Sequence, residues 1–138
     1  KQGLAGLRLG ILAGDPAWLA EFDKLRLPYN INSLTQASAV FALQHKDVLD
    51  DQAARLRQER ERLYQSLRVL SGVQVWPSAA NFILFKITTM RAPAVFEGLR
   101  QRGVLIKNLD GMIPGCLRVT VGTPEENTTF LNALTASL

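Results

Sequence analysis

The sequence predicts an α/β fold in which a few-stranded sheet is packed by helices. Over residues 47–71, apolar side chains recur at alternating steps of four and three, the spacing of one long amphipathic helix. Beyond residue 72, short segments rich in β-branched and aromatic residues alternate with segments of helical spacing. The 138 residues are 47% hydrophobic and 20% charged, a composition typical of a globular domain. These observations favour a layered α/β unit.

The long helix has a recognisable beginning and end in the sequence. Asp47, Asp50 and Asp51 lie at its amino end, where the helix dipole favours negative charge. Gly72 is placed as its carboxyl cap. One face of this helix carries an apolar stripe, interrupted only by Arg60, and we expect the stripe to face a packing partner. A coiled coil is the alternative, but about three heptads without a continuing repeat favour a core helix.

The rest of this region predicts further strands and helices in alternation. We expect strands over residues 73–76, 82–87, 104–107 and 117–121. We expect helices over residues 94–102 and 125–134, the second opened by a capping signal that begins at Thr123. The order from residue 47 is therefore helix, two strands, helix, two strands, helix.

The first 45 residues predict a strand followed by two helices. Residues 7–13 form an apolar run bounded by glycines, which indicates a buried strand. Asp15 can cap a helix that has Pro16 at its first position, and another helix starts at Ser33. We place a domain boundary between residues 32 and 33.

Composition and charge exclude several classes of function. The net charge of +4 is spread among interleaved acidic residues, which argues against nucleic-acid binding. The longest uncharged stretch, residues 27–45, is too polar to span a membrane. Cys116 and His45 are the only residues of their kinds, which argues against disulfides and metal sites and favours a reducing, cytoplasmic setting.

Two basic residues near the beginning of the chain could serve one cofactor. Lys1 precedes a loop of small residues, and Arg8 follows seven residues later, at the start of the expected strand. An amine that condenses with an aldehyde needs freedom and a lowered pKa, and a fixed guanidinium can bind phosphate as a fork. The alternative, which the residues alone favour, is a surface lysine and an interfacial arginine.

Arg118 is a second candidate, because it stands inside an apolar strand. A charge on a mostly buried strand is costly unless it is paired, so Arg118 needs an anionic partner. That partner is either a structural carboxylate or the carboxylate or phosphate of a ligand. Lys107, at the end of the preceding strand, either joins Arg118 in an anion site or is only solvated.

Five motifs in the chain resemble those of one enzyme family. They are KxGLAGLRLG from Lys1, PYNINSLTQ from Pro28, ANFILF from Ala80, VLIKNLDG from Val104 and CLRVTVGTPEEN from Cys116. In this order they resemble the carboxy-terminal part of histidinol-phosphate aminotransferases. Those enzymes depend on pyridoxal phosphate and have the fold-type-I architecture.

The resemblance implies a role for each of the four basic residues. Lys1 matches the lysine that forms the Schiff base with pyridoxal phosphate and moves the substrate's proton, and Arg8 matches the arginine that binds the cofactor phosphate. Arg118 matches the arginine that grips the anionic group of the substrates. Lys107 stands where many members have a second arginine, so it keeps the charge but loses the bidentate fork.

The resemblance also implies how the chain is organised and what it does. Residues 1–32 would be the tail of a large pyridoxal-phosphate domain, and residues 33–138 the connecting helix and small carboxy-terminal domain. The parent protein would be a homodimer that transfers an amino group between glutamate and imidazole acetol phosphate, in histidine biosynthesis. The chain begins with Lys1 and looks like a cut inside a larger protein, so by itself we expect it to be inactive.

Two other classes of function remain open. A free-standing α/β module that binds a small anion through Arg118 would need no pyridoxal phosphate. A structural dimerisation unit is favoured if Trp18, Phe22 and residues 27–45 form an exposed apolar interface.

Overall fold

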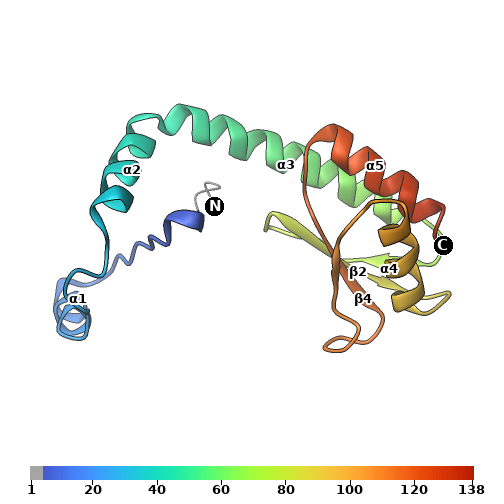
Figure 1. Ribbon diagram of the computed structural model, residues 1–138, viewed down its shortest axis with the longest axis horizontal. Coiled ribbons are helices and arrows are strands. Elements are labelled where there is room, and N and C mark those ends of the chain that lie inside the picture. The colour runs from blue at the N-terminus through green and yellow to red at the C-terminus, as the bar shows by residue number, and fades with distance from the viewer. Residues whose placement is uncertain (1–4) are drawn as a thin grey trace. The chain divides into compact units, whose positions relative to one another are not determined.

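A computed structural model describes residues 5–138 of the chain (Figure 1). It divides into two compact units, Lys1–Ala53 and Ala54–Leu138, and the long helix α3 (Lys46–Arg68) crosses the division. Within residues 5–138, no helix combines the length and the apolar character that crossing a membrane requires.

The first unit contains the short 3₁₀ helix η1 (Ala5–Leu7) and the helices α1 (Pro16–Asp23) and α2 (Ser33–Gln44). Asp15 caps α1, since its Oδ1 accepts a hydrogen bond from the Ala17 amide at 2.8 Å. Asn32 caps α2 in the same way through the Thr35 amide, also at 2.8 Å. The structure thus confirms the helix expected after Asp15 and the one expected from Ser33.

The prediction of a strand over residues 7–13 is wrong. Residues 8–15 lie in neither a helix nor a strand, and the apolar side chains of Ile11 and Leu12 are exposed. A strand forms only where a neighbour satisfies its backbone groups, and no described residue pairs with this segment.

Apolar side chains elsewhere in the first unit are also exposed. Trp18, Phe22 and Phe41 are all more than half exposed. Thr35 is the only buried residue among those that the structure describes up to Ala53. The described side chains of this unit therefore form no closed core of their own.

The long helix α3 ends earlier than expected. Its last residue is Arg68, and residues 69–72 form a turn in which the Leu70 amide donates to the Leu67 carbonyl. Gly72 is therefore not the helix cap. It has a φ of +80° in the turn that leads into the sheet, where a side chain would collide with Thr89.

The second unit has an antiparallel four-stranded sheet with the order β1-β2-β4-β3. The strands are β1 (Val73–Val75), β2 (Phe82–Ile87), β3 (Lys107–Asn108) and β4 (Cys116–Thr120), and the helices that follow β2 and β4 are α4 (Ala92–Gln101) and α5 (Pro124–Thr135). This is the expected order of helices and strands, and it confirms the α/β fold class.

Strand β3 is shorter than expected, because only two residues of the edge segment pair with β4. The Val104 amide donates instead to the Leu99 carbonyl of α4, at 2.9 Å. This bond ties the start of the segment to the helix rather than to the sheet.

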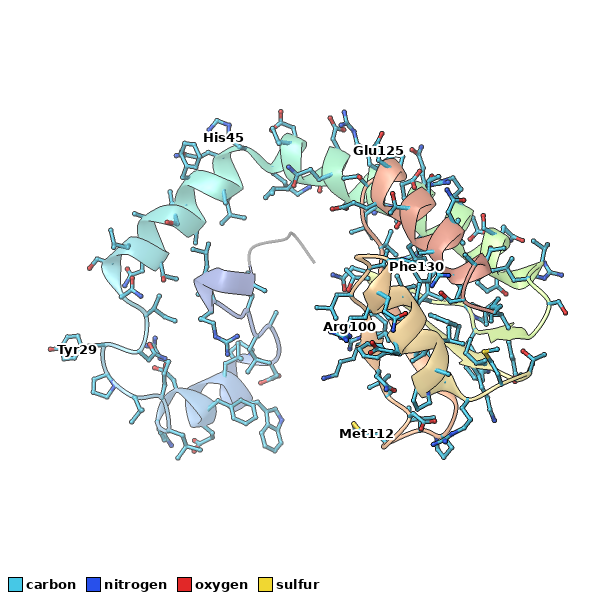
Figure 2. The ribbon with its side chains drawn as sticks, turned by 45° about the vertical axis from the view of Figure 1, so that its right-hand side comes forward. Tyr29, His45, Arg100, Met112, Glu125 and Phe130 are labelled. Atoms are coloured by element: carbon cyan, nitrogen blue, oxygen red, sulfur yellow. The ribbon has the colours of Figure 1, made fainter. Side chains whose placement is uncertain are left out.

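One face of the sheet forms the core of the second unit. In β2, buried side chains alternate with half-exposed ones, and in β4 the buried Leu117 and Val119 flank the half-buried Arg118. The buried apolar side chains of both strands pack with Leu63 and Leu67 of α3. Phe85 of β2 meets Phe130 of α5, their rings 6.0 Å apart and close to edge-on. Helix α5 lies beside the carboxyl-terminal half of α3 (Figure 1), and Phe130 projects from it (labelled in Figure 2). All three helices thus contribute to the core on one face.

Polar side chains of α3 and α5 hold the turn that follows β4. Asn127, which is 1% exposed, bonds both the amide and the carbonyl of Gly122 and donates to Glu59 at 2.9 Å. Arg62 makes a paired contact with Glu59 and donates to the Pro124 carbonyl at 2.9 Å. The turn after β4 is therefore fixed to α3.

Arg60, the charge that interrupts the apolar stripe of α3, has a structural role at the same end. Its Nη1 donates to the Ala80 carbonyl at 3.1 Å, just before β2 begins. This hydrogen bond explains why a charged residue stands within the otherwise apolar stripe of α3.

The Glu59 contacts predict a pH dependence of stability. The hydrogen bond from Arg62, followed by that from Asn127, lowers the pKa of Glu59 below its ordinary value of 4.5. The stabilisation is complete above that ordinary value and is lost as the pH falls through the lowered pKa. We expect Glu59→Gln to flatten the fall in unfolding free energy below pH 4.5, as measured by urea denaturation. Glu61→Gln, on the exposed side of α3, is the control and should leave that fall unchanged.

Candidate anion-binding site

Arg118 lies in the middle of β4, on the face of the sheet opposite the core. Its neighbours along the strand, Leu117 and Val119, are buried, and Arg118 itself is half-buried. The strand register places it opposite Leu84 of β2 on one side and opposite Lys107 of β3 on the other. The alternation of the strand therefore directs this guanidinium away from the hydrophobic core.

The Arg118 side chain has an aromatic contact but no acidic partner among the residues that the structure describes. Its guanidinium carbon lies 4.7 Å from the centroid of the Phe82 ring. Its Nε is buried without a hydrogen-bond partner, and no ion pair of residues 5–138 includes Arg118. A buried donor without an acceptor costs free energy that a bound acceptor would recover. An anionic ligand fits this geometry.

Lys107 supplies a second positive charge next to Arg118. The two residues are directly opposed in the antiparallel pair of β3 and β4, where Cβ atoms lie about 4.5–5.5 Å apart. Lys107 is exposed and forms no ion pair with another described residue. Like charges so close repel each other, and an anion between them would relieve the repulsion.

Removing Lys107 should weaken anion binding only modestly. Because its ammonium is exposed, we expect Lys107→Ala to raise the Kd for inorganic phosphate by about two- to fivefold. We expect Lys107→Arg to bind at least as tightly as the wild type, since the guanidinium adds a fork. Calorimetric titration checks both variants, and a Lys107→Ala protein that binds as tightly as the wild type would exclude Lys107 from the site.

The other two candidate residues belong to the first unit. Lys1 lies outside the residues that the structure describes. Arg8 is exposed, directly follows η1, and has a φ of +55°, which is uncommon for a residue with a side chain. Its amide donates to the Ala5 carbonyl at 3.1 Å. The structure therefore brings Arg118 and Lys107 together, and it describes Arg8 separately from them.

The candidate residues suit phosphate and carboxylate groups. Lys107 and Arg118 of the second unit are cationic side chains, which bind such groups through charge-assisted hydrogen bonds. Arg8 of the first unit is also cationic and can bind a phosphate by itself. Among residues 5–138, no three His, Cys, Asp or Glu side chains gather where they could hold a metal ion. The cationic donors of each unit therefore fit the phosphate and carboxylate groups that pyridoxal phosphate and its substrates carry.

The sequence did not indicate that Phe82 belongs to this site. It placed Phe82 at the start of a strand but assigned it no contact. The signal was the alternation in ANFILF, which puts Phe82 and Leu84 on one face. Pairing this face with Arg118 also required the register of β2 against β4, which the sequence does not state.

The class of protein follows from a match to a known family over nearly the whole chain. Residues 1–134 match the family model described as aminotransferase class I and II. The chain belongs to this family.

Curated relatives of the chain include histidinol-phosphate aminotransferases. The chain is 55% identical to a histidinol-phosphate aminotransferase of Nitrosococcus oceani and 56% identical to one of Ralstonia nicotianae. The alignments cover 99% and 100% of this chain but 39% and 37% of the relatives. The resemblance found in the motifs is confirmed, and the chain spans about two fifths of the length of these curated relatives.

Solved structures agree with the fold. A putative aminotransferase from Burkholderia pseudomallei has a TM-score of 0.85 at 30% identity, covering 98% of this chain and 41% of that one. A histidinol-phosphate aminotransferase from Clostridium acetobutylicum, 21% identical, has a TM-score of 0.76 and covers 85% of this chain and 36% of that one. The second likeness shows the fold alone.

Proposed function

We propose that the chain is part of a cytoplasmic pyridoxal-phosphate-dependent aminotransferase. The enzyme transfers an amino group between glutamate and imidazole acetol phosphate, as the names of the relatives suggest. The observation that carries the proposal is the buried Nε of Arg118, which lacks an acceptor and lies on the open face of the sheet opposite Lys107. Both substrates have an anionic group that this pair can bind.

Each basic residue has one task in this proposal. Arg8 binds the phosphate of the cofactor, and Arg118 binds the carboxylate or phosphate of the substrate with help from Lys107. Lys1 holds the cofactor through its Nζ and moves the proton of the substrate α-carbon. Pyridoxal phosphate, when bound, supplies the electron sink that makes this carbon acidic.

The proposal includes a division of labour between two domains. We assign residues 1–32 to a large domain and residues 33–138 to a connecting helix and a small domain. The exposed apolar side chains of Trp18 and Phe22 support the assignment, since a large domain or a second subunit of a homodimer would cover them. The chain by itself should then show little or no transaminase turnover with pyridoxal phosphate and glutamate. Robust turnover would contradict this division.

A segment exchange tests the proposed activity. The matching segment of the Nitrosococcus oceani relative is replaced by residues 1–138 of this chain, which are 55% identical over the aligned length. We expect this chimera to transfer the amino group of glutamate to imidazole acetol phosphate. Reduction with borohydride and peptide mapping should find pyridoxal phosphate on the Nζ of Lys1 and should find none in a Lys1→Ala chimera. A cofactor trapped on another lysine would contradict the role of Lys1.

The same experiment separates the proposal from an anion-binding module. Such a module would bind phosphate through Arg118, as the buried Nε allows, but would retain no pyridoxal phosphate. A folded chimera that binds phosphate at Arg118, retains no pyridoxal phosphate and transfers no amino group would favour the module and overturn the proposed activity.

A further inference from the structure

Phe82 is an aromatic residue on the open face of the sheet, outside the hydrophobic core. Its strand neighbours Ile83 and Phe85 are both fully buried in the core cluster, whereas Phe82 is half-buried and does not belong to it. A large apolar side chain at such a position contributes little to the core. The guanidinium carbon of Arg118 lies 4.7 Å from the centroid of the Phe82 ring.

The register of the strands explains how the ring reaches the guanidinium. Leu84 is directly opposite Arg118, and Phe82 is two residues away on the same face of β2. Diagonal neighbours at this spacing remain within reach when one of the side chains is aromatic. The ring therefore crosses from β2 to cover the Arg118 side chain on β4.

The backbone around Phe82 is held more firmly than a strand end requires. Its carbonyl accepts a hydrogen bond from the Ser78 hydroxyl at 2.6 Å. The same hydroxyl accepts a hydrogen bond from the Ala80 amide at 3.0 Å. The two preceding carbonyls also accept hydrogen bonds. The Asn81 carbonyl accepts one from the Val121 amide at 2.9 Å, and the Ala80 carbonyl accepts one from the Arg60 guanidinium at 3.1 Å. The backbone that carries Phe82 is therefore fixed by α3 and by the residue that follows β4.

An aromatic face can orient a guanidinium without competing for its donors. The ring attracts the cation through its π electrons but offers no lone pair that would occupy the N–H groups in their plane. A carboxylate in the same place would fix the arginine equally well and would also neutralise it. The stacked ring therefore leaves the charge and the fork free for a ligand while it restricts the side chain.

We propose that Phe82 is a positioning residue: its ring stacks on the Arg118 guanidinium and holds it in the conformation that binds an anion. The inference rests on the anion-binding role proposed for Arg118. It assigns to the ANFILF motif a task in ligand binding in addition to its place in the sheet.

Three variants of the 138-residue chain test this role, with inorganic phosphate as the probe. Phe82→Leu keeps the apolar character but removes the π face, Phe82→Tyr keeps the ring, and Arg118→Lys identifies the Arg118 signal in ¹H–¹⁵N spectra of arginine Nε groups. We expect Phe82→Leu to shift the Nε–H resonance of Arg118 and to raise the phosphate Kd by about three- to tenfold. Phe82→Tyr should restore both to nearly the wild-type values.

The outcomes separate this inference from the proposed function. If Phe82→Leu binds phosphate as tightly as the wild type and leaves the Nε resonance in place, the positioning role is overturned and the anion site stands. If phosphate does not move the Arg118 resonance in the wild type, both are overturned. Thermal unfolding shows whether each variant is folded, and Phe82→Met replaces Phe82→Leu if the latter is not. Loss of binding in folded Phe82→Leu or Phe82→Met, with rescue in Phe82→Tyr, supports the role.

Discussion

Replacing Arg118 with alanine is expected to weaken phosphate binding to this chain by about 10- to 100-fold. Hydrogen bonds to a charged group each contribute about 1.5–3 kcal/mol, and each 1.4 kcal/mol is roughly a factor of ten in Kd. The variant removes the guanidinium whose Nε has no acceptor among the described residues. Calorimetric titration with phosphate at constant ionic strength measures the change.

Arg100→Ala is the matched control for this substitution. Arg100 is exposed on α4, where it forms an ion pair with Glu97, and Figure 2 shows it on the outer surface of that helix. The control removes the same unit of charge and should leave the phosphate Kd unchanged apart from a small salt-sensitive effect. Equal weakening in both variants would mean that net charge, and not a site at Arg118, attracts the anion.

Replacing Phe85 with alanine is expected to produce the largest loss of stability. Phe85 is fully buried in the centre of the sheet and contacts Phe130 of α5 edge-on at 6.0 Å. Truncation of a buried phenylalanine leaves a cavity and costs about 3–5 kcal/mol. We expect a fall of this size in the free energy of unfolding, as measured by urea denaturation with circular dichroism.

The adjacent residue Leu84 supplies the control for Phe85→Ala. Leu84 points to the opposite, half-exposed face of the same strand. Leu84→Ala should therefore cost less, about 1 kcal/mol, because solvent already reaches its side chain. A similar loss at both positions would contradict the assignment of the core to one face.

The sequence predicts those elements whose cause is local. Asp15 and Thr123 begin helices because their side chains accept backbone amides within three residues, and the structure shows both bonds. The strand expected over residues 7–13 failed because a strand depends on a partner that local sequence does not reveal. The end of α3 was misplaced for a similar reason, since Gly72 suits either a helix cap or a turn.

The candidate site was predicted in part for the same physical reasons. A charge in an apolar strand is visible in the sequence, so Arg118 could be singled out together with the nearby Lys107. The contact with Phe82 depends on the register between β2 and β4, and the hydrogen bond from Arg60 depends on the packing of α3 near the start of β2. Both are long-range arrangements that no short motif encodes.

The unfolding free energy of Arg118→Leu shows whether Arg118 serves a ligand or the fold. Leucine removes the buried Nε that lacks a partner among the described residues, and it retains an apolar contact with Phe82. We expect the ligand-free variant to be as stable as the wild type or more stable, even though it no longer binds phosphate. A loss of about 3 kcal/mol or more would mean that Arg118 is a structural residue and not part of a ligand site.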